Sequence, residues 1–132
     1  MTITVGINGF GRIGRATLAH ISESLRNDIK VVKVNATGPI ETAAHLMRYD
    51  SVHGRFPHPV TVEDGCMDLG RGPIEMFSTY DMTSLDWDGI DVVMECTGKF
   101  NDGLTARTHL DRGAGKVLLS APGKNVDRTV VY

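Results

Sequence analysis

The chain has 132 residues, and its 14 Lys and Arg against 16 Asp and Glu give a formal net charge of −2. This length fits one ordinary domain and allows a sizeable core. The hydrophobic fraction is 41% and the charged fraction 23%, values that exclude the disordered, collagen-like and coiled-coil classes. A near-neutral charge balance gives no electrostatic reason to expect a nucleic acid or a membrane surface as a partner.

The cysteines favour a reducing compartment, and the hydropathy pattern predicts neither secretion nor membrane insertion. Cys66 and Cys96 show neither metal-ligand spacing nor a disulfide framework. No apolar run approaches the ~18 residues that span a bilayer, and residues 1–15 lack the pattern of a signal peptide. The histidines are scattered and predict no metal site: His20, His45, His53, His58 and His109. We therefore expect a cytoplasmic protein.

A strand, a helix and a second strand are predicted at the start of the chain. Residues 3–7 are a β-branched run that stops at Asn8-Gly9, which is typical of a buried strand meeting a turn. Apolar residues at helical spacing predict a helix over 11–25. The next expected elements are a strand over 31–34 and a short helix over 42–48. Strand, helix and strand within ~30 residues form a βαβ unit.

The pattern changes between residues 53 and 77, where apolar residues alternate with others and Gly-rich turns separate the runs. Alternation with turns between the runs predicts antiparallel hairpins. The βα order then returns, with elements expected over 90–94 (strand), 102–112 (helix), 116–119 (strand) and 129–132 (strand). The whole predicts an α/β fold of the Rossmann type, a doubly wound and mainly parallel sheet with a small antiparallel hairpin insertion.

The segment between the first strand and the first helix reads Gly9-Phe10-Gly11-Arg12-Ile13-Gly14, which matches the pattern G-x-G-x-x-G. Its glycines permit a tight turn, the approach of a pyrophosphate and close packing of helix on strand. A pyrophosphate there would face free N–H groups at the helix N-terminus, including those of Arg12 and Ile13. Because the flanking elements are the expected ones, we interpret this turn as a dinucleotide site.

The second strand ends in Asn35-Ala36-Thr37, where a dinucleotide-binding unit usually carries an Asp or Glu that binds the ribose. A carboxylate there would repel a 2′-phosphate, so its absence removes a barrier to NADP. Asn35 and Thr37 could donate hydrogen bonds to such a phosphate. Weaker NAD binding without a gain for NADP is the alternative, so the cofactor is predicted to be NAD or NADP.

Four strings resemble phosphorylating glyceraldehyde-3-phosphate dehydrogenase, in order and in spacing, and together they extend over essentially the whole chain: residues 5–15 (VGINGFGRIGR), 49–56 (YDSVHGRF), 95–98 (ECTG) and 120–122 (SAP). Erythrose-4-phosphate dehydrogenase is a close relative with the same motifs. The resemblance implies a cofactor site around the pyrophosphate loop and on the nicotinamide-ribose side. Its implied residues are Asn8, Gly9, Gly11, Arg12 and Ile13 in the loop, then Thr97, Gly98 and Ser120.

Three positions depart from the family pattern. Ala36 stands where an acidic residue is usual, Tyr80 where an Arg is common, and Lys99 where an apolar residue is usual. The first departure resembles the NADP-tolerant branch of the family. The second removes a side chain that contacts the cofactor in relatives.

The resemblance also implies what the chain does not contain. The family's nucleophilic Cys lies in a Ser-Cys-Thr-Thr-Asn-Cys motif beyond residue 132, and its activating His lies further on. We therefore expect residues 1–132 to be a dinucleotide-binding domain, a piece of a longer homotetrameric enzyme, with no catalytic residue of its own. Its expected partners are the cofactor and the missing C-terminal catalytic domain. The alternatives are a stand-alone nucleotide-binding or interaction module and the cofactor domain of an erythrose-4-phosphate dehydrogenase.

Overall fold

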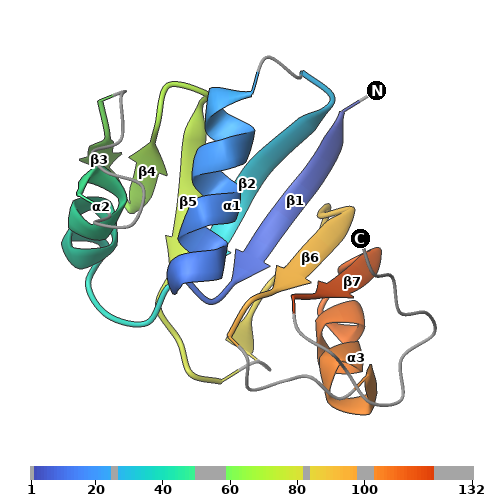
Figure 1. Ribbon diagram of the computed structural model, residues 1–132. Helices are drawn as coiled ribbons and strands as arrows, with labels where there is room; N and C mark the ends of the chain where they lie inside the picture. The colour runs from blue at the N-terminus through green and yellow to red at the C-terminus, as the bar shows by residue number, and fades with distance from the viewer. Residues whose placement is uncertain (1, 25–26, 50–58, 82–83, 98–102, 121–132) are drawn as a thin grey trace.

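The computed structural model describes residues 2–24, 27–49, 59–81, 84–97 and 103–120, which form one sheet with helices packed on it (Figure 1). Its elements in chain order are β1 (Ile3–Asn8), α1 (Arg12–Glu23), β2 (Ile29–Asn35), α2 (Ile40–Arg48), β3 (Thr61–Glu63), β4 (Cys66–Asp68), β5 (Pro73–Phe77), β6 (Val92–Glu95), α3 (Gly103–Asp111) and β7 (Lys116–Leu119). Every element that the sequence predicts before residue 120 is present. The strand predicted over 129–132 lies outside the described residues.

The sheet has seven strands in the order β3-β4-β5-β2-β1-β6-β7. The pairs β5–β2, β2–β1, β1–β6 and β6–β7 are parallel, whereas β3–β4 and β4–β5 are antiparallel. The predicted Rossmann-type sheet is therefore confirmed. The hairpin is part of that same sheet, because β5 pairs with β4 on one side and with β2 on the other.

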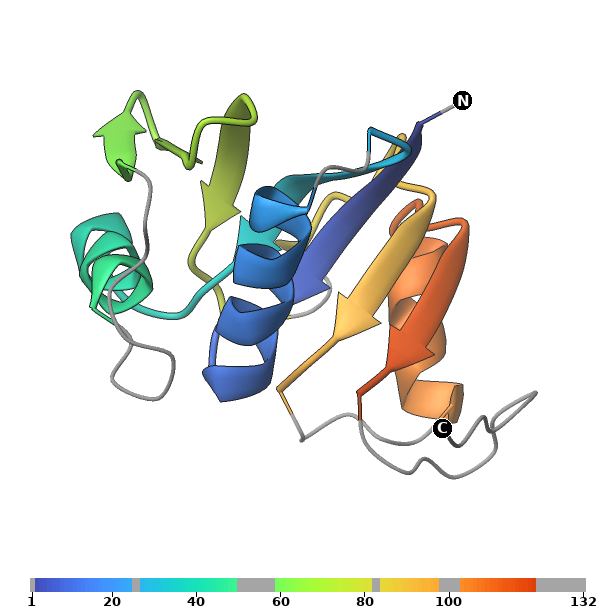
Figure 2. The ribbon, with the colours of Figure 1, turned by 45° about the horizontal axis from the view of Figure 1, so that its top comes forward.

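Two helices lie on opposite faces of the sheet, α1 against β1 and β2 and α3 behind β7 (Figure 2). One core cluster covers the α1 face and includes Val5, Ile7 and Leu18. The other contains Leu85, Trp87 and Val93. Side chains alternate across a strand, so residues 5 and 7 of β1 face the first cluster while Gly6 faces the second.

Apart from β7, the strands and helices whose bounds were predicted differ from the structure by one or two residues at their ends. The strand predicted over 90–94 is Val92–Glu95 in the structure. The carboxylate of Asp91 instead accepts hydrogen bonds from the Thr4 backbone N–H (2.9 Å) and the Thr4 hydroxyl (3.2 Å). The helix predicted over 42–48 begins earlier, at Ile40, directly after Pro39. In the described part of the chain, no helix is long and apolar enough to cross a membrane.

Candidate functional site

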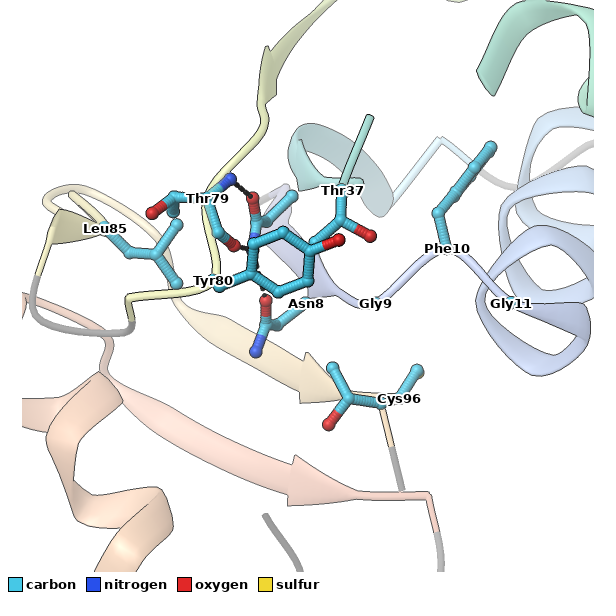
Figure 3. Close-up of a pocket in the computed structure, with 11 residues that line it drawn as sticks. Asn8, Gly9, Phe10, Gly11, Thr37, Thr79, Tyr80, Leu85 and Cys96 are labelled. Carbon is cyan, nitrogen blue, oxygen red and sulfur yellow. Dashed lines mark hydrogen bonds between the residues drawn. The ribbon is translucent and has the colours of Figure 1, made fainter. Parts of the chain in front are cut away.

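A cavity of about 250 Å³ opens where β1, β2 and β6 end (Figure 3). These are the carboxyl ends of parallel strands, and β1 is the strand from which the chain winds in both directions. In open α/β sheets, ligands bind at such a point. The cavity is lined by Asn8, Gly9, Phe10, Gly11, Asn35, Thr37, Thr79, Tyr80, Leu85, Cys96 and Thr97.

The glycine-rich turn is pressed against the end of β6. Gly9 has a φ of 101°, a left-handed conformation that favours glycine. A Cβ atom at Gly9 would also lie 2.8 Å from the Thr97 backbone nitrogen, and one at Gly14 would collide with the Gly9 carbonyl oxygen. At Gly11 an added Cβ would meet nothing within 4 Å. Two glycines thus permit the close packing, and the third leaves space for a ligand.

The N-terminus of α1 lies beside this space, because the residue that precedes the helix, Gly11, lines the cavity. The first helical bond that follows the turn runs from the Arg15 N–H to the Gly11 carbonyl (2.9 Å), so the N–H groups of residues 12–14 have no acceptor within the helix. The first turn carries no acidic side chain. The Arg15 guanidinium donates to the Phe10 carbonyl (2.9 Å) and braces the turn. Such a helix end attracts anions.

On the β2 side, the Asn35 amide acts like an additional strand residue. It donates through Nδ2 to the Thr79 carbonyl (2.9 Å) and accepts the Thr79 N–H at Oδ1 (3.0 Å). These two hydrogen bonds to the Thr79 backbone fix which way the Asn35 amide faces. It also places Thr79 and Tyr80, which follow β5, at the mouth of the cavity, as Figure 3 shows.

Beneath the cavity lies Glu95, whose side chain is fully buried at the end of β6. Its Oε1 accepts hydrogen bonds from Asn8 Nδ2 (2.6 Å) and lies 2.8 Å from His109 Nε2. Its Oε2 accepts the Thr97 N–H (2.9 Å) and the Thr97 hydroxyl (2.6 Å). Burial by itself raises the pKa of Glu95, but the hydrogen bonds from His109, Thr97 and Asn8 outweigh it, so the pKa lies below the ordinary value of 4.5. Glu95 is a carboxylate at neutral pH.

Cys96 lies at the cavity wall, and its environment suppresses its reactivity. Burial raises the pKa of its thiol above the ordinary 9.0, and the nearby Glu95 charge acts in the same direction against a hydrogen bond with Ser120. The thiolate is the nucleophilic form of cysteine. Cys96 is thus a small buried residue whose thiol is held in the protonated, weakly nucleophilic form.

The predicted site residues fall into three groups in the structure. Those that line the cavity are Asn8, Gly9, Phe10, Gly11, Asn35, Thr37 and Thr97. Those that flank it are Arg12, Ile13 and Gly14 in the first turn of α1, Ala36, whose side chain packs into the core, and Ser120 just after β7. Gly98 lies outside the described residues, as does Lys99.

Sequence reasoning did not predict four of the cavity residues as site residues: Thr79, Tyr80, Leu85 and Cys96. It noted Tyr80 only as a departure from the family, and it missed the buried role of Glu95 and His109. A signal for Glu95 was present, because an acidic residue that ends a buried strand needs hydrogen-bond donors.

Comparison with known proteins gives the family. A model of the NAD-binding domain of glyceraldehyde 3-phosphate dehydrogenase matches residues 3–103. Glyceraldehyde-3-phosphate dehydrogenases of Cereibacter sphaeroides and Xanthobacter flavus are 54% and 51% identical to this chain over 132 and 134 residues. Each alignment includes 100% of this chain but 40% of the relative, so the chain spans two-fifths of their length. With its sheet order and glycine-rich turn, this chain belongs to the family of glyceraldehyde 3-phosphate dehydrogenase NAD-binding domains.

Proposed function

We propose that residues 1–132 form a cofactor domain that binds NAD or NADP in the cavity at the ends of β1, β2 and β6. The observation that carries this proposal is the combination of that cavity with the free N-terminus of α1 beside it. In this arrangement the N–H groups of Arg12 and Ile13 would face the pyrophosphate, and the open space over Gly11 would admit it. Thr37 would lie on the adenosine-ribose side and Thr97 on the nicotinamide side.

Within a longer protein, this domain would serve a cytoplasmic oxidoreductase that converts an aldehyde phosphate, inorganic phosphate and NAD(P)⁺ into an acyl phosphate, NAD(P)H and a proton. Glyceraldehyde 3-phosphate is the substrate that the names of the relatives support. The cofactor supplies hydride acceptance, and residues 1–132 supply its binding and orientation. The nucleophile and base would come from a C-terminal catalytic domain, in a homotetramer.

Titration calorimetry of the 132-residue chain with NAD and with NADP tests this proposal. We expect the wild-type chain to bind at least one of them. Gly11→Asp should weaken binding by about tenfold or more, because a carboxylate would stand where the pyrophosphate approaches. Asp is a favourable residue at a helix N-cap, so the fold should keep its stability.

Gly11→Asn is the matched control, because it has the same shape and the same capping ability without the charge. It should bind more tightly than Gly11→Asp at an equal melting temperature. A folded wild-type chain that binds neither dinucleotide contradicts the proposal, as does equal binding by all three chains.

The 132-residue chain alone should not turn over glyceraldehyde 3-phosphate, since its cavity cysteine is a protonated, buried thiol. The measurement is NAD(P)H absorbance in the presence of substrate, phosphate and cofactor, with a full-length relative as the positive control. Turnover that exceeds the background would contradict the assignment of chemistry to a separate domain.

A further inference from the structure

A directed hydrogen-bond network runs beneath the cavity from β2 across β1 and β6 to α3. Its members are the side chains of Asn35, Asn8, Glu95, His109 and Trp87, all of them buried. Asn35 Nδ2 donates to Asn8 Oδ1 (2.8 Å), and Asn8 Nδ2 donates to Glu95 Oε1 (2.6 Å). From the other end, Trp87 Nε1 lies 2.9 Å from His109 Nδ1. Glu95 and Asn8 are 87 residues apart in sequence.

The direction of each bond follows from the chemistry of the two ends. The Trp87 indole has only a donor, so His109 Nδ1 must be the acceptor and carry no proton. The single proton of the neutral imidazole then resides on Nε2, which donates to Glu95 Oε1 (2.8 Å). At the other end, the two bonds to Thr79 fix the Asn35 amide. Asn8 therefore has only one orientation that satisfies both of its neighbours.

Both arms of the network thus donate toward one carboxylate, which also accepts two bonds from Thr97. Asn8 and Thr97 line the cavity, whereas Glu95 and His109 do not. We propose that Glu95 is a positioning residue of the cofactor cavity: its carboxylate fixes the side chains of Asn8 and Thr97, and the Trp87–His109 pair holds that carboxylate from the α3 side of the sheet. This inference rests on the proposed function, because the cavity that it serves is the dinucleotide site.

The network identifies the variant that tests it most sharply. Each oxygen of Glu95 accepts two donors, so Glu95→Gln places an NH2 group against donors whichever way the amide turns. The substitution hardly changes the side-chain volume. It should weaken binding of the preferred dinucleotide by about tenfold, because a buried donor without an acceptor moves to relieve its desolvation.

His109 provides a second pair of variants, which keeps the test valid if Glu95→Gln does not fold. His109→Gln retains a donor for Glu95 and an acceptor for Trp87, whereas His109→Phe retains a ring and loses both. His109→Phe should weaken binding by about threefold or more, and His109→Gln should restore most of the loss. Neither substitution touches the cavity wall.

Met67→Ala is the control for loss of stability alone. Met67 is fully buried on β4, away from the cavity, and its truncation lowers stability through packing. Calorimetric affinity and melting temperature are measured for every variant, at a temperature where each is folded. We expect Met67→Ala to bind the dinucleotide as tightly as the wild type. Wild-type affinity in folded Glu95→Gln and His109→Phe, or an equal loss of affinity in Met67→Ala, overturns the inference.

A nitrogen-15 NMR measurement separates failure of this inference from failure of the proposed function. A wild-type chain that binds no dinucleotide refutes the function, and the network is then judged without ligand. The side-chain amide of Asn8 and the backbone N–H of Thr97 should shift in His109→Phe and stay in place in Met67→Ala. Unshifted resonances in His109→Phe, or a protonated Nδ1 in wild-type His109, overturn the positioning role.

Discussion

Single residues at the end of β2 set the charge that the cavity presents on this side. Ala36 is 6% exposed, and its backbone N–H donates to the Phe77 carbonyl (2.9 Å). Its side chain packs into the core, while the next residue, Thr37, lines the cavity. The described cavity wall therefore carries no acidic side chain on this side. A 2′-phosphate would meet hydroxyl and amide groups rather than a carboxylate.

Thr37→Asp should introduce discrimination against the 2′-phosphate, because Thr37 lines the cavity. A carboxylate there should raise the ratio of the NADP to the NAD dissociation constant by about tenfold, through repulsion of two like charges. Calorimetry with both cofactors measures the ratio. Thr37→Asn adds a side chain of the same size as Asp without the charge, and its ratio should stay close to that of the wild type. An unchanged ratio in Thr37→Asp would refute this account of specificity.

At the scale of elements, β1 organises both faces of the sheet. Gly6 interrupts its apolar run, and a Cβ atom there would lie 2.6 Å from Trp87 Cζ3. The missing side chain lets the Trp87 ring pack closely against β1, and the ring lies 5.8 Å from that of His109 between centroids. The glycine thereby makes room for the residue that anchors the buried network.

Gly6→Ala should destabilise the chain by about 1–3 kcal/mol, because the added methyl overpacks against the Trp87 ring. Denaturant unfolding measures the loss, and the emission of Trp87, the only tryptophan, reports the displaced ring. In a Trp87→Leu background, Gly6→Ala should lower the free energy of unfolding by a smaller amount, since the colliding ring atoms are absent. Equal losses in the two backgrounds would show that the ring is not the cause.

The same elements show how far sequence reasoning reaches. β7 is predicted with its bounds, and the glycine-rich turn with its role in packing, because both depend on local pattern. The partners of Glu95 could not be predicted, since the Asn8 and His109 contacts exist only once β6 pairs with β1 and α3 packs on the sheet. Thr79 lies in a segment without periodicity, so its place at the cavity depends on the Asn35 amide.

For the whole molecule, one buried carboxylate links stability to acidity. Glu95 has a folded-state pKa below its ordinary value of 4.5, so the folded state binds this proton less readily than the unfolded state. The ionised Glu95 therefore adds to the free energy of unfolding. This added stability is complete above about pH 4.5 and is lost as the pH falls through the lower, folded-state pKa. The hydrogen bonds that hold the cavity side chains are thus also a source of acid sensitivity.

We expect Glu95→Gln to be less stable than the wild type by about 1–3 kcal/mol at pH 7, because buried donors lose their acceptor. That difference should narrow as the pH falls below 4.5. Urea unfolding at a series of pH values from 7 to 3 measures it. Glu63→Gln removes an exposed carboxylate from β3, and its free energy of unfolding should change with pH in the same way as that of the wild type. A constant gap between Glu95→Gln and the wild type would contradict the assigned shift.

The pairing of β1 with both β2 and β6 also has a consequence for synthesis. Val5 pairs with Val31 on β2 and with Val92 on β6. One edge of β1 therefore stays unpaired until β6 is synthesised, 87 residues later. At about 5–20 residues per second this takes roughly 4–17 s, and an unpaired strand edge invites pairing with other chains. The nascent chain should therefore depend on chaperones until residue 97 leaves the ribosome, because Cys96 and Thr97 complete the cavity wall.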